Sequence, residues 1–492
     1  MTERLHDGRG SVARGDEHER PPKAKRKAFV KTLLALAGIA AVTLVAAAGA
    51  PAAKPFAPHQ EPRGIGNLIV QGDGISLVYD APGFNRTIGT VYVRSDAQRS
   101  FTALTLRHLS RGSAIEVRVP ARLVHGQKLS YYAVIRDRGS KRSARVPARG
   151  MTSALILEHP VKVALGAHHF GQTRAPSTVV ARTSADQVGW QIPPPGGWGT
   201  SFGPETFLVA PDGSTWLDDG LNNRLLGWDA GHPDTIVRTV PLPDLSADHD
   251  VALGPNHTFY ITGVVGRGAA TRFVLYRLSA TGRVLWRSKL AGSAVGDANT
   301  FNLSWNSQLR TGSDGTLYLL VAMPGLPGGQ QGWMPVATPA GRPLTLAGQR
   351  RGTHWPDQPL RGGMRLISEA YAPKTNGPVR EVRYALLDRK GRLVRSWRVT
   401  STTDIGLDYT TSELVGGDPV AVLDVYANGK LEYVVLRLGP HGVRSQFSIP
   451  RAIFGDNLLA DVRIGPDGRL YQLATSPESG VIINRYSLGR AS

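Results

Sequence analysis

Four side chains that could bind a metal ion lie at matching distances before short turns of the sequence. Glu205 and His249 lie seven residues before a turn, and Asp250 and Asp461 lie six residues before one. If the strands that begin at these positions pack around one axis, the four side chains form one rim. Carboxylate oxygens with one imidazole suit Ca²⁺ or Zn²⁺. The pattern predicts a metal site, and it leaves open a non-catalytic ligand site or a polar lining without a special role.

Contiguous catalytic motifs are absent from the sequence. It contains no Gly-x-Ser-x-Gly elbow, no His-Glu-x-x-His, no phosphate-binding glycine loop and no Asp-x-Asp-x-Asp calcium loop. It also lacks cysteine, which excludes disulfides, thiolate zinc sites and cysteine nucleophiles. The catalytic residues, if there are any, are therefore unknown. The adjacent His168 and His169 are interpreted as surface residues of a linker.

A regular repeat covers the C-terminal part of the chain. Its glycine turns recur at intervals of 47 to 59 residues, at Gly231, Gly282, Gly341, Gly391, Gly442 and Gly489. This period is typical of one four-stranded propeller blade. The repeat also contains a second turn of the Asp-Gly type, as at Asp212-Gly213, between two apolar strands. Two hairpins per repeat predict an all-β fold with a six-bladed β-propeller at residues 193–492.

One repeat resembles a known family. Residues 211–228 carry Asp219, Asn222 and Arg224 at the spacing of the NHL repeat, followed by an aliphatic residue. The trio is missing from the repeats at residues 245–290 and 451–492. The resemblance implies that the trio mainly fastens the blade. NHL-like relatives include gluconolactonase-type hydrolases and peptide-amidating lyases with channel metals, which implies an alternative, enzymatic function.

The last repeat ends after its third strand, so a fourth strand must come from elsewhere in the chain. An open sheet edge would expose unpaired backbone groups. Residues 187–192 resemble the outermost strands of other repeats and are predicted to supply this strand. Residues 158–192 are accordingly expected to be a linker with a propeller-closing strand.

The N-terminus predicts export from a bacterial cell. Residues 1–27 form a basic cytoplasmic tail, and residues 28–50 form a transmembrane helix or a signal sequence. Residues 32–50 are uncharged and would span about 28 Å as a helix, which is close to the thickness of a bilayer core. Positive charge before the span orients the later domains outward. The alternative is secretion after signal cleavage.

A second β domain follows a Pro-rich linker at residues 51–64. Residues 65–157 contain seven short alternating strands, which predicts a small β-sandwich of fibronectin or immunoglobulin type. Residues 61–170 carry 16 basic and 7 acidic residues. This charge favours an anionic envelope polymer or lipid head groups as a partner, and a merely solvated surface is the alternative. Nucleic acid is excluded because no basic helix or RNA-binding motif is present.

These features predict an exported, membrane-anchored cell-surface protein that binds or scaffolds through its propeller face, with a protein or envelope polymer as ligand. The alternative is a metal-dependent hydrolase or lyase that acts on a small molecule, with Ca or Zn in the propeller channel. Binding or scaffolding requires no catalytic turnover.

Overall fold

The computed structural model describes residues 58–60, 67–81, 87–108, 114–139, 142–192, 201–204, 206–245, 250–265, 272–293, 301–302, 308–322, 331–353, 357–371, 378–406, 412–454 and 461–489. The predicted cytoplasmic tail and membrane helix lie outside the described residues. No helix in these ranges has both the length and the apolar character needed to cross a membrane. The prediction of an all-β protein is confirmed, because the described residues contain one α-helix, α2 (Leu346–Gly352), among many strands.

The N-terminal part of the described chain forms two sheets. The first sheet has the order β1 (His59–Gln60), β3 (Ile75–Asp80), β7 (Ala114–Val119) and β6 (Arg107–His108). The second has the order β2 (Leu68–Val70), β10 (Thr152–Leu157), β8 (Lys128–Asp137), β4 (Thr87–Ser95) and β5 (Thr102–Thr105), with β9 (Ser143–Val146) paired to β8. All seven predicted strands are present. One of them is divided between β5 and β6, so the chain changes sheet there.

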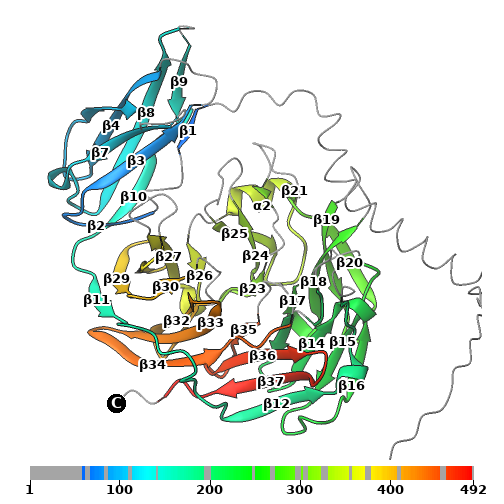
Figure 1. Cartoon of the computed structure of the whole chain (residues 1–492). Coiled ribbons are helices and arrows are strands. Elements are labelled where there is room, and N and C mark those ends of the chain that lie inside the picture. The colour runs from blue at the N-terminus through cyan, green and yellow to red at the C-terminus, as the bar shows by residue number, and fades with distance from the viewer. Residues whose placement is uncertain are drawn as a thin grey trace, which may run out of the picture. The chain divides into compact units, whose positions relative to one another are not determined.

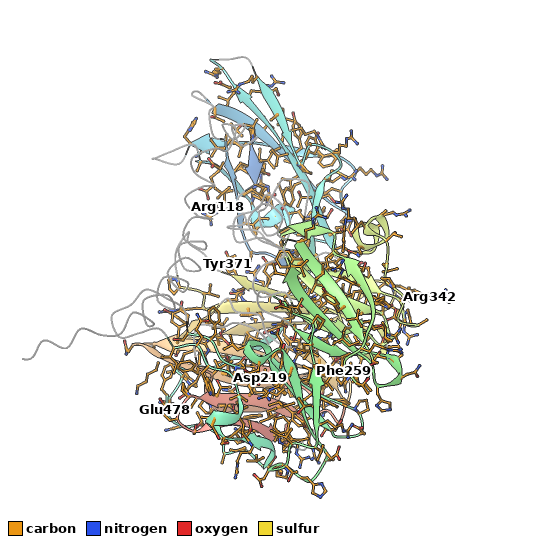
Figure 2. The ribbon with its side chains drawn as sticks, turned by 90° about the vertical axis from the view of Figure 1, so that its right-hand side faces the viewer. Arg118, Asp219, Phe259, Arg342, Tyr371 and Glu478 are labelled. Atoms are coloured by element: carbon orange, nitrogen blue, oxygen red, sulfur yellow. The ribbon has the colours of Figure 1, made fainter. Side chains whose placement is uncertain are left out.

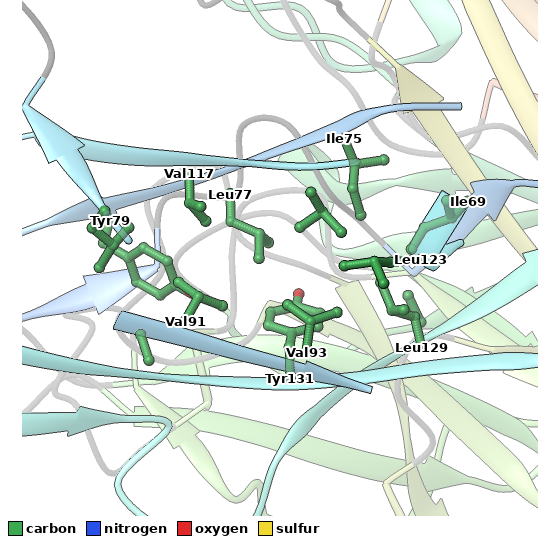
Figure 3. Packing of buried hydrophobic residues seen from close by; sticks show 14 of the residues in the cluster. Ile69, Ile75, Leu77, Tyr79, Val91, Val93, Val117, Leu123, Leu129 and Tyr131 are labelled. Carbon is green, nitrogen blue, oxygen red and sulfur yellow. The ribbon is translucent and has the colours of Figure 1, made fainter. Parts of the chain in front are cut away.

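Alternation of apolar and polar residues explains how these two sheets share one core. In β3, every second residue is buried, and Leu77 and Tyr79 point into the same cluster as Tyr131 of β8. Figure 3 shows these side chains between the strands. The hydroxyl of Tyr131 accepts a hydrogen bond from Gln60 at 3.0 Å. Because side chains alternate with period two, a slip by one residue would turn the whole apolar set outward.

Six further sheets follow in chain order. The first contains β13 (Thr206–Val209), β14 (Thr215–Asp219), β15 (Arg224–Trp228) and β16 (Arg238–Pro241), and the second contains β17 (Val251–Leu253), β18 (Phe259–Val265), β19 (Arg272–Leu278) and β20 (Val284–Lys289). The third contains β21 (Gly292–Ser293), β22 (Phe301–Asn302), β23 (Leu309–Thr311), β24 (Leu317–Ala322) and β25 (Gln331–Ala337), and the fourth contains β26 (Gln358–Pro359), β27 (Arg365–Tyr371), β28 (Glu381–Leu387) and β29 (Leu393–Thr400). The fifth contains β30 (Asp404–Ile405), β31 (Ser412–Val415), β32 (Asp418–Ala427), β33 (Lys430–Gly439) and β34 (Gly442–Pro450), and the sixth contains β35 (Val462–Ile464), β36 (Leu470–Ser476) and β37 (Gly480–Tyr486).

Four of the predicted glycine turns, at Gly231, Gly282, Gly391 and Gly442, connect strands within these sheets, whereas Gly341 lies between β25 and α2, and Gly489 follows β37. Gly231, Gly282, Gly341 and Gly391 have φ between 76° and 84°, a region that disfavours other residues. At Gly282, an added Cβ would also lie 2.5 Å from the carbonyl oxygen of Pro241. The 3₁₀ turns of the described residues are η1 (Ala121–Leu123), η2 (Ala185–Gln187), η3 (Gly220–Asn222), η4 (Pro255–His257) and η6 (Arg361–Gly363).

Two strands from residues 158–192 complete sheets that lie far away in the sequence. β12 (Thr178–Thr183) pairs antiparallel with β37, and Figure 1 shows the two side by side. β11 (Val161–Ala164) pairs in parallel with β29. The prediction that residues 187–192 would complete the last sheet is wrong, although an upstream strand does complete it. β12 is rich in β-branched residues, whereas side chains of the first of the six sheets hold the backbone at residues 187–189, as described below.

Candidate functional site

A buried carboxylate connects four of the six sheets. Asp250 is fully buried just before β17. Its Oδ1 accepts hydrogen bonds from the hydroxyl of Thr206 in β13 at 2.7 Å and from its neighbour Val251 N, and it forms an ion pair with Arg463 of β35. Its Oδ2 accepts from Leu309 N of β23 at 2.6 Å. The carboxylate therefore has four donors, as a buried charge requires.

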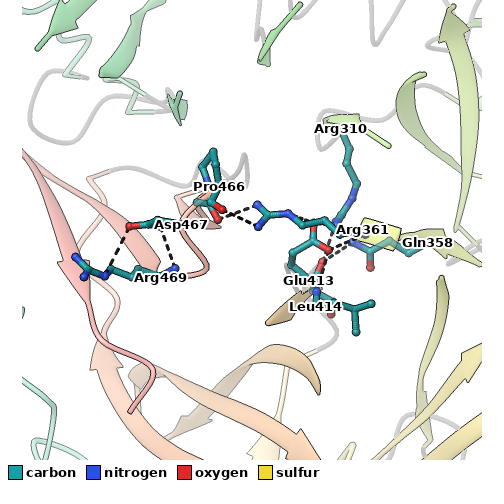
Figure 4. Close-up of polar contacts among 10 residues, drawn as sticks. Arg310, Gln358, Arg361, Glu413, Leu414, Pro466, Asp467 and Arg469 are labelled. Atoms are coloured by element: carbon teal, nitrogen blue, oxygen red, sulfur yellow. Dashed lines mark hydrogen bonds and ion pairs between the residues drawn. The ribbon is translucent and has the colours of Figure 1, made fainter. Parts of the chain in front are cut away.

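A second cluster connects the remaining sheets (Figure 4). Arg310 of β23 donates to the carbonyl oxygen of Ser412 at 2.8 Å and to Glu413 of β31 at 2.5 Å. Glu413 also accepts from the backbone N–H of Arg361, which follows β26. Arg361 in turn donates to the carbonyl oxygens of Gly465 and Pro466, in the turn after β35, at 2.8 and 3.0 Å. Burial lowers the pKa of Arg310, and the nearby Glu413 opposes that effect.

The predicted metal rim is only partly within the described residues. Glu205 and His249 lie outside them. Asp461 accepts a hydrogen bond from the hydroxyl of Tyr433 at 2.7 Å, and burial, followed by the charge of Asp461, raises the pKa of Tyr433. Asp250 is held by Arg463. Within the described ranges, no group of three His, Cys, Asp or Glu residues could hold a metal ion.

The NHL-like trio lies where β14 ends, at Asp219, and η3 leads into β15 (Figure 2 labels Asp219). Asp219 is buried, and its Oδ2 accepts from Asn222 at 2.9 Å and from Arg224 Nε at 2.8 Å. Its Oδ1 accepts from the backbone N–H of Gly189 at 2.8 Å, and Arg224 also donates to the carbonyl oxygen of Gln187. These contacts hold residues 187–189 against the first sheet. Asp219 and Arg224 bind this backbone directly, and Asn222 contributes by donating to Asp219.

His168 differs from the surface residue that the sequence predicted. Its side chain is 10% exposed, and Nε2 lies 2.8 Å from Oε2 of Glu432 in β33. Oε1 of Glu432 accepts from Gly171 N at 2.7 Å. A cavity of about 170 Å³ adjoins His168, and its polar lining also includes His169, Gln172, Ser401, Gln446 and Ser448. The pair anchors the segment between β11 and β12, a contact between residues 264 positions apart that no local pattern indicates.

Sequence reasoning also missed the three arginines that connect these sheets, namely Arg310, Arg361 and Arg463. A usable signal existed for two of them. Arg310 and Arg463 are the central residues of the three-residue strands β23 and β35. A cation in a short, otherwise largely apolar strand needs a nearby acceptor. Which acceptor it finds depends on the arrangement of the sheets.

Comparisons with known proteins give weak matches. No family model and no curated protein matches the chain. A solved structure described as the eukaryotic initiation factor has 11% identity and a TM-score of 0.25, and the match covers 82% of this chain and 98% of that one. A DUF4784 family protein from Bacteroides caccae has 10% identity and a TM-score of 0.22, covering 89% and 97%. A putative glycosidase from Bacteroides thetaiotaomicron has 11% identity and a TM-score of 0.25, covering 65% and 96%. Scores this low carry no inference about fold or function.

Proposed function

We propose that this chain is an exported, membrane-anchored protein that binds or scaffolds ligands at the cell surface through an NHL-like six-bladed β-propeller. The observation that carries the proposal is the use of charged groups at the inner strands. Asp250, Arg463, Arg310 and Glu413 all contact groups on neighbouring sheets. Side chains used in this way stabilise a scaffold, whereas a reaction needs groups that face a substrate.

Two features support a ring of six blades. First, the polar contacts run from β35 to β13, β17, β23, β31 and η6, and η6 returns to the turn after β35. Second, β12, which precedes the first of the six sheets in the chain, pairs with β37 of the last sheet. Pairing of an upstream strand with the final sheet is a way for propellers to protect their sheet edges.

Export and anchoring rest on the sequence. The basic residues before the uncharged stretch at residues 32–50 favour an N-terminus in the cytoplasm. The basic charge of residues 61–170 favours an anionic envelope polymer or lipid head groups as one partner. The propeller face would take a protein or a second envelope ligand.

Elemental analysis of the purified full chain separates this proposal from a channel-metal hydrolase or lyase. We expect no stoichiometric Ca or Zn, because Asp250 is already neutralised by Arg463. Stoichiometric metal that is lost in Glu205→Ala or Asp461→Ala, and retained in the surface variant Asp234→Ala, would favour the enzyme.

Topology is tested by adding protease to intact cells. We expect digestion of residues 193–492 and protection of residues 1–27, because the positive charge before the span holds the tail inside. Antibodies against each end of the chain would detect the loss of the C-terminal part and the survival of the N-terminal tail. Recovery of the intact chain in the cytosolic fraction would contradict export.

A further inference from the structure

The outer face of the second N-terminal sheet carries a row of stacked rings and cations. Tyr92 of β4 lies directly opposite Tyr132 of β8, and their rings stack with centroids 4.9 Å apart. The guanidinium of Arg145, from β9, lies 4.2 Å from the centroid of Tyr132. Phe101 packs edge-on against Tyr132 at 5.5 Å, and Arg94 lies 4.7 Å from the centroid of Phe101. Arg94 and Arg145 thus flank a cluster of three contacting rings on this face.

This face has positive charge without compensating acid. Arg94, Lys128, Arg136 and Arg145 belong to its strands, and none of the four has a carboxylate partner among the described residues. The single acidic residue in β4, β5, β8, β9 and β10 is Asp137, which is 3% exposed. The outer face of the other sheet is mixed, because Glu116 of β7 accompanies Arg107 and Arg118. The asymmetry concentrates positive potential on one side of the domain.

On the same face, beside the apolar side chains of Ile88, Ala103 and Val134, hydroxyl groups occupy several other outward positions. They belong to Thr90, Thr105, Ser130, Ser143 and Ser153, of which Ser130 and Ser153 lie 3.3 Å apart. Arg145 is held in place because it donates to the carbonyl oxygens of Pro147 and Gly150. A cation held in this way loses little conformational freedom when it binds an anion.

We propose that this face, defined by Tyr92, Arg94, Phe101, Tyr132 and Arg145, binds an anionic polysaccharide. The cations match carboxylate or phosphate groups on the polymer, and the tyrosine, serine and threonine hydroxyls match its sugar hydroxyls. One face of the Tyr92 ring stacks on Tyr132, and the other face can contact a sugar ring. The inference rests on the proposed function, in which the basic domain meets an envelope polymer, and it assigns that contact to one sheet.

Binding of the full chain to polygalacturonate, measured by affinity electrophoresis in detergent, tests the assignment. In the variant Arg94→Gln with Arg145→Gln, we expect a loss of at least about tenfold, because charge-assisted contacts are the strong ones. The matched control is Arg107→Gln with Arg118→Gln on the other sheet, which removes the same charge and should change binding less than about twofold. Tyr92→Phe with Tyr132→Phe keeps the stacking, and we expect a smaller loss of binding.

Four outcomes would overturn the assignment, and they are distinguishable. Equal losses in the two arginine pairs would indicate net charge alone. Wild-type binding in both pairs would place the polymer elsewhere on the chain. Binding to vesicles of phosphatidylcholine with phosphatidylglycerol, but not to polygalacturonate, would identify lipid as the partner. If the wild-type chain binds neither probe, the polyanion part of the proposed function fails as well. Circular dichroism of each variant excludes unfolding as the cause of a loss.

Discussion

Replacement of Asp250 by alanine is expected to lower the free energy of unfolding by about 3–5 kcal/mol, the usual cost of removing one partner from a buried ion pair. The variant leaves the guanidinium of Arg463, which is 19% exposed, without its carboxylate. It also removes the acceptor of Leu309 N and of the hydroxyl of Thr206. Because these donors come from different sheets, the loss should weaken contacts between sheets. Urea unfolding of the full chain measures the effect.

The matched control for Asp250 is Asp234→Ala. Asp234 pairs with Arg182 at 3.5 Å, and the side chains are 68% and 53% exposed. Surface pairs of this kind contribute about 0–1 kcal/mol, so this variant should unfold near the wild-type midpoint. If Asp250→Ala is no more destabilised than Asp234→Ala, the buried carboxylate does not hold the sheets together. Asp250→Asn, which keeps the shape and removes the charge, should fall between wild type and Asp250→Ala.

The variant Gly480→Ala is expected to separate β12 from the last sheet. Gly480 has φ of 87°, and an added Cβ would clash with the backbone carbonyl of Thr183. Left-handed backbone costs a non-glycine residue about 1–2 kcal/mol, and forced overpacking adds about 1–3 kcal/mol. We expect a lower melting temperature and new proteolytic cleavage near residues 178–192.

Gly429→Ala separates backbone strain from the clash with β12. Gly429 has φ of 75°, and no atom lies within 4 Å of its added Cβ. This variant should therefore lose only the stability that left-handed backbone costs a non-glycine residue, and it should show no cleavage near β12. Equal melting temperatures for the two variants would mean that β12 contributes little to the last sheet. Cleavage near β12 in both variants would lead to the same conclusion.

Local sequence signals predicted most of the strands and turns. The two apolar strands predicted on either side of Asp212-Gly213 both occur, as β13 and β14. Such signals work because alternation and positive φ are properties of a few neighbouring residues. The closing strand was assigned to the wrong segment for the same reason. Residues 187–192 resemble an outer strand locally, and only their contacts with Asp219 and Arg224 distinguish them from β12.

The candidate site was less predictable than the strands. Counting from the turns correctly placed Asp250 and Asp461 directly before strands, β17 and β35. It did not predict that Asp250 would be paired with Arg463, 213 residues away, or that Glu432 would hold His168. The same limit applies to the face around Tyr132. The net positive charge of residues 61–170 was visible in the sequence, but the concentration of that charge on one sheet depends on which strands pair.

The sequence by itself determined that this protein is all-β, with strands divided by glycine and Asp-Gly turns, because those features follow from local backbone preferences. It also determined the absence of thiol chemistry, since the chain has no cysteine. Only the tertiary structure decided that β12 completes the last sheet, and that Asp250 pairs with Arg463 and Glu413 with Arg310 across sheets. These outcomes depend on burial and on the meeting of distant residues. A carboxylate such as Asp250 either stabilises contacts between sheets or coordinates a metal ion, depending on which donors the fold brings to it.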